Sequence, residues 1–111
     1  MERKDVLKDL YELVLDRKQN PQEGSYTNYL FSKGRDKILK KVGEEATEVI
    51  IEGKNPEGKT TAVSEICDLL YHLTVLMADM DIDLDAVYSE LDERRKKMGN
   101  LKAERKEIVD L

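Results

Sequence analysis

Apolar residues recur at three- and four-residue spacings through four long segments of this 111-residue chain. That period places them on one face of an α-helix. Only 2 prolines and 6 glycines interrupt the chain, so each periodic segment runs long before it ends. The pattern predicts an all-α protein with helices over residues 3–17, 36–53, 60–79 and 84–98.

The breaks between these segments are short. Residues 55–58, Asn-Pro-Glu-Gly, form a clear helix stop, and Asp83 is the expected N-cap of the last helix. Residues 25–34 form an aromatic-rich connector, which we expect to be a flexible loop with room for a turn of helix. Four amphipathic helices with short loops predict an antiparallel helical bundle, and the length predicts one domain over residues 1–111.

The segment 60–79 is apolar around more than half of its circumference, so it is expected to be the most buried helix. Cys67, the only cysteine, is expected to be a small core residue within it. In the last helix, we expect Val87, Tyr88 and Leu91 to face inward. One small chain covers such an apolar helix poorly, so we expect a homodimer or higher homo-oligomer to complete the bundle.

Charge and hydropathy exclude several classes of partner. The net charge of −5 argues against a nucleic-acid-binding protein, which usually shows a basic balance or stripe. The aromatic share of 5%, with no Trp, argues against a stacking platform for single strands. The sequence shows neither a signal peptide nor a stretch near the roughly 20 apolar residues of a membrane span. A cytoplasmic protein is expected.

Four acidic residues on two neighbouring predicted helices are the most informative feature for function. Glu45 and Glu48 are three residues apart, as are Glu65 and Asp68, so each pair shares a helix face. Glu45 and Glu48 alone are compatible with an ordinary solvated face. Apolar residues flank the second pair, however, and a buried carboxylate costs several kcal/mol unless it is paired or coordinated.

A hairpin closed at residues 55–58 would bring the two acidic pairs face to face. Four converging carboxylates are hard oxygen ligands that suit Mg²⁺ or Mn²⁺. No Lys or Arg lies between Lys59 and Arg94 to neutralise the second pair instead. Glu44 lies about 100° around the helix from Glu45, so it is either a ligand at the rim of the site or a solvent-exposed residue.

His72 and Glu52 continue the two acidic stripes by one helical turn. A di-iron bundle would need a Glu-x-x-His motif on each of two helices, and this sequence has none. We therefore expect His72 to be a hydrogen-bonded residue behind the ligands, or in the core, rather than a ligand itself.

Cationic and hydroxyl side chains precede the first acidic pair. Lys41 and Lys37 lie one and two turns before Glu45, where they would meet a phosphate. Ordinary pairs on a solvated helix face, such as Lys41 with Glu45, explain these lysines equally well. The connector adds three hydroxyls that could close over a substrate, from Ser25, Tyr26 and Thr27.

Two acidic motifs resemble those of the all-α nucleotide pyrophosphohydrolases, the superfamily that includes MazG and the dimeric dUTPases. They are E-E-x-x-E at residues 44–48 and E-x-x-D at residues 65–68. Three stretches resemble the phosphoribosyl-ATP pyrophosphatase family in particular: GSYTNYLFSKGRDKILKKVGEEATEVIIEGKN (24–55), EICDLLYHLTVLM (65–77) and LDERRKK (91–97). The sequence departs from that pattern at Glu52-Gly53, where small residues are frequent, so the role of Glu52 stays open.

The resemblance implies a MazG-like bundle and a reaction in which phosphoribosyl-ATP and water give phosphoribosyl-AMP and pyrophosphate, the second step of histidine biosynthesis. It implies Mg²⁺, or Mn²⁺ in its place, and the metal ligands would be Glu45, Glu48, Glu65 and Asp68. Glu44 or Glu48 is then the expected catalytic base. The residues expected to hold the phosphates or the ribose are Ser25, Tyr26, Thr27, Lys37 and Lys41.

Two other functions are compatible with parts of the pattern. A house-cleaning pyrophosphatase for dUTP, dCTP or damaged triphosphates would use the same acidic residues, and residues 25–34 would set the difference in specificity. A non-catalytic helical interaction protein would bind no Mg²⁺. It would also become more stable when Asp68 is replaced by Leu, because a buried charge without a partner would be removed.

Overall fold

The computed structural model describes residues 4–99, which form five α-helices and no strand. The helices are α1 (Val6–Gln19), α2 (Tyr26–Lys33), α3 (Arg35–Lys54), α4 (Lys59–Asp79) and α5 (Leu84–Gly99). The all-α prediction is confirmed, and every predicted helix is present with bounds close to those expected. Residues 1–3 and 100–111, which the single-domain prediction also covers, lie outside the described part of the chain.

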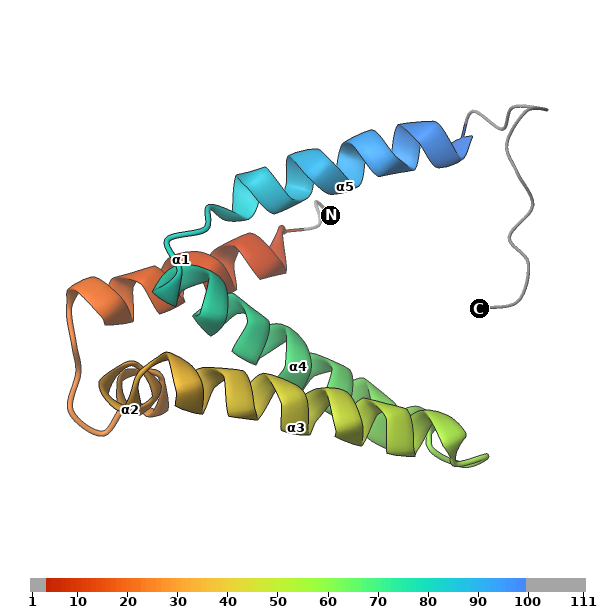
Figure 1. The fold of residues 1–111 in the computed structure, drawn as a ribbon, viewed down its shortest axis with the longest axis horizontal. Helices are drawn as coiled ribbons and strands as arrows, with labels where there is room; N and C mark the ends of the chain where they lie inside the picture. Colours follow the sequence, from red (N-terminus) through yellow and green to blue (C-terminus); the bar gives the residue numbers. More distant parts are fainter. Residues whose placement is uncertain (1–3, 100–111) are drawn as a thin grey trace.

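Helices α3 and α4 form an antiparallel hairpin, and α1 packs across the C-terminal half of α4 (Figure 1). The short helix α2 lies at the corner between α1 and α3. Helix α5 makes little contact with the other four. Within the described residues, one chain is therefore a helical hairpin with two helices packed at one end, and the closed bundle stays a prediction.

The connector between α1 and α3 is a capped helix. Ser25 is the N-cap of α2, and its Oγ accepts a hydrogen bond from the backbone nitrogen of Asn28 at 3.2 Å. The side chain of Asn28 donates to the backbone oxygen of Arg17 at 2.6 Å. Gly34 ends the helix with φ 93°, a conformation that glycine adopts without a Cβ clash. Helix is present before Gly34, as expected, but it covers most of the connector. The prediction of a flexible loop there was wrong, because these polar side chains organise the segment locally.

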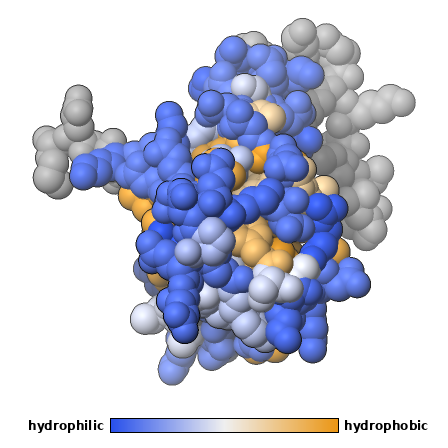
Figure 2. Space-filling model, turned by 90° about the vertical axis from the view of Figure 1, so that its left-hand side faces the viewer, coloured by the Kyte–Doolittle hydropathy of each residue, from blue (hydrophilic) through white to orange (hydrophobic). Residues whose placement is uncertain are grey.

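The core lies where α1, α2, α3 and the second half of α4 meet. Its fully buried side chains are Val14, Leu30, Ile38, Val75 and Ala78. The first half of α4 is less well covered, with Val63 59% exposed and Ile66 and Leu70 each 43% exposed. The expected deep burial of α4 thus holds only for its second half, and Cys67, expected in the core, is exposed. Figure 2, which views the molecule from the end opposite the α3–α4 turn, shows a separate area of apolar surface within a mainly hydrophilic face.

Two cations hold the C-terminal end of α4. Lys18 on α1 donates to the backbone oxygen of Ala78 at 2.8 Å and to Asp81 at 3.0 Å. Arg35 on α3 donates to the carboxylate of Asp79 at 2.8 Å. The last carbonyls of a helix lack intrahelical donors and carry partial negative charge, so cations are stabilising there.

Helix α5 begins as predicted but does not lie over the core. The carboxylate of Asp83 accepts a hydrogen bond from the backbone nitrogen of Asp85 at 3.0 Å, as expected of an N-cap. Tyr88, half-buried, donates to the carboxylate of Asp5 at 2.8 Å, which joins α5 to the start of α1. Leu91, expected to face inward, is 56% exposed, because no helix of the described chain covers that side of α5.

Helix α4 is long and apolar enough, by length and composition, to cross a membrane, which the sequence-based expectation had excluded. The core helices of soluble proteins share this property. Moreover, α4 carries Glu65, Asp68 and His72, which are costly in hydrocarbon. The length and composition of α4 are thus weak grounds for a membrane span.

Candidate metal centre

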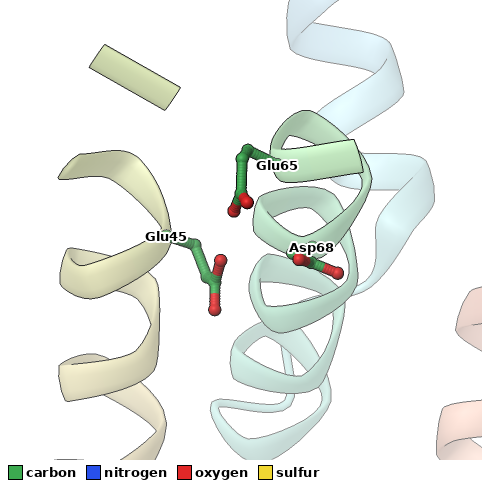
Figure 3. A group of neighbouring side chains, drawn as sticks. All are labelled: Glu45, Glu65 and Asp68. Atoms are coloured by element: carbon green, nitrogen blue, oxygen red, sulfur yellow. The ribbon is translucent and has the colours of Figure 1, made fainter. Parts of the chain in front are cut away.

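Three carboxylates come together across the α3–α4 hairpin. Glu45 on α3 and Glu65 and Asp68 on α4 each offer one oxygen, and these oxygens lie within 4.8 Å of one another. In Figure 3, Glu45 and Glu65 reach into the space between the two helices, and Asp68 lies one turn further along α4. Three of the four predicted metal ligands therefore form one acidic group.

The hairpin turn sets the register that brings these acids together. The side-chain oxygen of Asn55 accepts from the backbone nitrogen of Glu57 at 3.1 Å, and its backbone oxygen accepts from Gly58 at 2.9 Å. A Cβ at Gly58 would lie 2.2 Å from the backbone oxygen of Glu52, so only glycine fits this position without a shift of the backbone. The helix stop seen in the sequence is thus the element that aligns α3 with α4.

The other acids of α3 lie outside this group. Glu48 is exposed, and its carboxylate oxygens are not among the grouped oxygens of Glu45, Glu65 and Asp68. Glu52 accepts a hydrogen bond from the hydroxyl of Thr61, across the hairpin. Glu52 therefore braces the turn, whereas a role for Glu48 as ligand or base stays a prediction.

Partial burial and the neighbouring acids raise the pKa of Glu65 above the usual glutamate value. Partial burial is the largest cause, followed by a hydrogen bond with Glu45 and by the negative charges of Asp68, Glu45 and Glu48. Each of these effects disfavours the ionised carboxylate in the absence of a cation. A bound divalent cation would instead favour the ionised carboxylate of Glu65, because the cation neutralises the converging negative charges.

We expect Glu65→Gln to raise the midpoint of thermal unfolding of the metal-free protein at neutral pH. A carboxyl whose pKa is raised on folding adds stability below its unfolded pKa, and that stability is lost as the pH rises through the folded pKa. The amide does not ionise. The increase in unfolding midpoint should therefore reach its full size at pH values above the folded pKa of Glu65, and it should vanish below about pH 4.3, the ordinary glutamate value.

Circular dichroism in EDTA across this pH range measures the effect. Glu57→Gln, in the exposed hairpin turn, is the matched control and should show no comparable gain. Equal midpoints for Glu65→Gln and the wild-type protein at every pH would contradict the raised pKa.

Two lysines of α3, Lys40 and Lys41, pair with Glu44. The Nζ atoms of Lys40 and Lys41 lie 4.0 Å and 3.5 Å from its carboxylate. The pKa of Lys41 is raised, chiefly by the charge of Glu44. Lys37, one turn earlier, is half-buried. Glu44 is exposed and outside the three-carboxylate group, so the sequence-based alternatives of rim ligand and solvent residue both remain open.

The hydroxyls predicted to close over a substrate, at residues 25–27, are engaged within the chain. The Tyr26 hydroxyl lies 3.1 Å from Nε2 of His72, and Thr27 is hydrogen-bonded to the hydroxyl of Tyr71. His72 is only 5% exposed, which confirms its prediction as a hydrogen-bonded residue of the interior. Tyr71 was not predicted from the sequence, although its position beside His72 within an apolar helix was a usable signal.

Fold and site define a class: an all-α protein with an acidic site, suited to a hard divalent cation, built across a helical hairpin. The family model described as phosphoribosyl-ATP pyrophosphohydrolase matches residues 7–95. The chain belongs to the phosphoribosyl-ATP pyrophosphohydrolase family, which confirms the resemblance seen in the sequence.

Individual relatives agree with the family match over their full lengths. A phosphoribosyl-ATP pyrophosphatase of Clostridium novyi (strain NT) is 52% identical over 111 residues, 100% of both chains. A protein of the same name from Clostridium botulinum (strain Kyoto / Type A2) is 53% identical over the same coverage. Another from Listeria monocytogenes serotype 4a (strain HCC23) is 56% identical over 106 residues, 96% of this chain and 100% of the relative.

Proposed function

We propose that this protein hydrolyses phosphoribosyl-ATP to phosphoribosyl-AMP and pyrophosphate, the second step of histidine biosynthesis. Relatives that this chain matches from end to end bear the name of that activity. The observation in the structure that carries the proposal is the convergence of Glu45, Glu65 and Asp68 between α3 and α4. A triphosphate needs charge neutralisation before water can attack it, and such a group recruits the cation that does so.

The donor set fits Mg²⁺, or Mn²⁺, as the cofactor. All three grouped side chains are carboxylates, and Mg²⁺ is usually held by one or two carboxylates together with waters and substrate phosphates. The raised pKa of Glu65 fits the same assignment, because partial burial and, to a smaller extent, the neighbouring acids disfavour its ionised form until a cation is bound. When bound, the ion would neutralise the triphosphate and position it for attack.

Residues around the acidic group are candidates for the catalytic base and for phosphate binding. Glu48 shares a helix face with Glu45 and is close enough for its charge to affect the pKa of Glu65, so it is the better candidate to accept a proton from water. Glu44 is instead held by ion pairs to lysines. Lys41 is a flexible point charge suited to a phosphate, and Lys37 would assist it from the preceding turn.

The proposed assembly is a homodimer that completes a MazG-like bundle. Val63, Ile66 and Leu70 are exposed and follow one another at three- and four-residue spacings, so they line one side of α4. At 3.6 residues per turn, that side lies opposite Glu65 and Asp68. A second copy could cover this apolar side without obstructing the acidic group. A cytoplasmic location fits the same proposal, because dimer burial would explain the apolar length of α4.

The activity is tested by ³¹P NMR of the purified protein with phosphoribosyl-ATP and Mg²⁺, beside matched samples with ATP, dUTP or EDTA. We expect pyrophosphate from phosphoribosyl-ATP alone, and none with EDTA. Pyrophosphate from dUTP or ATP instead would retain the acidic site but replace the proposed substrate by those of a house-cleaning pyrophosphatase. No pyrophosphate in any sample would refute the proposed activity.

A further inference from the structure

The start of α2 is fastened to α4 through the single histidine of the chain. The Tyr26 hydroxyl lies 3.1 Å from Nε2 of His72, and Nδ1 of His72 lies 2.9 Å from the backbone oxygen of Asp68. The two rings also meet edge to face, with 5.9 Å between their centroids. His72 is 5% exposed, so water competes little for these contacts. The histidine thus links α2 to a residue of the acidic group.

These two hydrogen bonds determine where the proton of the imidazole ring lies. A backbone carbonyl oxygen can only accept, so Nδ1 of His72 carries the hydrogen and donates it to Asp68. Nε2 of the neutral ring is then an acceptor, and the hydroxyl of Tyr26 donates to it. Both ring nitrogens are satisfied, and the ring is held in one orientation between the two helices.

Tyr26 also borders the region that would hold a substrate phosphate. Burial raises the pKa of Tyr26, and the charges of Lys41 and Glu45 act on it in opposite directions, so both lie near the phenol. The adjacent hydrogen bond between Thr27 and Tyr71 runs in parallel from α2 to α4. The first turn of α2 is therefore fixed at two neighbouring points beside the acidic group.

We propose that Tyr26 and His72 are a pair of positioning residues that hold α2 in register with the turn of α4 carrying Asp68. Tyr26 acts through His72, rather than by a direct contact with the substrate. The effect on turnover rests on the proposed function, since a displacement of about 1 Å in a positioned site can cost about 100-fold in rate.

Three substitutions separate the two hydrogen bonds. Tyr26→Phe removes the hydroxyl and keeps the ring, and Tyr26 is 45% exposed, so folding should tolerate the change. His72→Asn places an amide near the position of Nδ1 and leaves Tyr26 without its acceptor. His72→Gln is the matched variant, because its longer amide can still accept from Tyr26.

We expect Tyr26→Phe and His72→Asn each to lower kcat about 10- to 100-fold, with little change in KM. The double variant Tyr26→Phe/His72→Asn should be no slower than the slower single variant, because both changes remove the same Tyr26–His72 hydrogen bond. His72→Gln should retain most of the wild-type rate. In substrate-free protein, hydrogen exchange of the α2 amides should be faster in Tyr26→Phe than in wild type, while exchange in α1 and α5 stays unchanged.

A raised KM with unchanged kcat in Tyr26→Phe would overturn the proposal, because it would indicate direct contact with the substrate. Losses that multiply in the double variant, or unchanged exchange in α2, would also overturn it. If the wild-type protein releases no pyrophosphate from phosphoribosyl-ATP, the proposed function fails separately. The exchange comparison uses no substrate, so it still decides whether Tyr26 and His72 hold α2 in place.

Discussion

Asp68→Asn and Glu45→Gln should each reduce pyrophosphate release from phosphoribosyl-ATP by about 1000-fold or more. Each substitution replaces one carboxylate of the acidic group by a neutral amide of almost the same shape. A bound metal ion contributes several kcal/mol to the stabilisation of transition-state charge, and each 1.36 kcal/mol corresponds to a factor of ten in rate. If the three grouped carboxylates bind the proposed metal ion, loss of one of them should therefore remove most of the catalysis.

The same variants should remain folded, since Glu45 is half-buried and Asp68, which its apolar neighbours suggested would be buried, is exposed, so an amide at either position does not disturb the core. Circular dichroism checks the fold, isothermal titration with Mg²⁺ measures metal binding, and ³¹P NMR measures turnover. Glu12→Gln, on the exposed side of α1, and Asp85→Asn, at the start of α5, are matched controls that should keep wild-type activity. Substantial turnover by either site variant would refute the metal assignment.

Stability in EDTA does not by itself separate an enzyme from a non-catalytic helical protein. Glu65→Gln and Asp68→Leu each remove one charge from the acidic group. The loss of repulsion should stabilise the metal-free protein whether it is an enzyme or a non-catalytic helical protein. Mg²⁺ separates them, because a ligand that binds only the native state raises its stability. We expect Mg²⁺ to stabilise the wild-type protein and to have little effect on the variants.

Ile66→Lys should weaken self-association by about 100-fold or more. Ile66 lies at the centre of the exposed apolar side of α4, where it is 43% exposed in one chain. In a symmetric dimer the substitution occurs twice, and an unpaired charge buried in an interface costs several kcal/mol. Since each 1.4 kcal/mol is a factor of ten in affinity, even partial burial gives a loss of this size.

Light scattering coupled to size-exclusion chromatography measures the change. We expect a mass of twice 12.8 kDa for the wild-type protein and a single-chain mass for Ile66→Lys at the same micromolar concentration. Val6→Lys, on the first turn of α1 and 73% exposed, adds the same charge to another apolar position and serves as the control. A wild-type monomer, or an unchanged mass for Ile66→Lys, would contradict the proposed interface.

Much of the local structure was predictable because its causes lie close together in sequence. The periodicity of 3.6 residues predicts each long helix, and Asp83 caps α5 as expected. The three-residue spacing of Glu65 and Asp68 places them on one face whatever the helix packs against. The turn at residues 55–58 predicts the hairpin that brings Glu45 to the other side of the same site.

The predictions that failed concern which side of a helix another element covers, and the structure of residues 25–34. Cys67 was expected in the core and is exposed, and Leu91 was expected to face inward and is 56% exposed. Residues 25–34 were expected to be flexible, yet Ser25 and Asn28 organise them into a helix joined to α1. For Cys67 and Leu91, the periodicity shows that an apolar face exists but does not identify the element that covers it; for residues 25–34, the hydrogen bonds of two polar side chains decide the structure.

By itself, the sequence determined the four long helices, their order and two acidic pairs, because backbone geometry and short spacings depend only on nearby residues. Only the tertiary structure decided that, of the acids on α3, Glu45 alone joins Glu65 and Asp68 in the three-carboxylate group, while Glu52 accepts a hydrogen bond from Thr61. It also decided that α2 is held through His72. Such contacts join residues far apart in sequence, and the register and crossing of packed helices select which of them form.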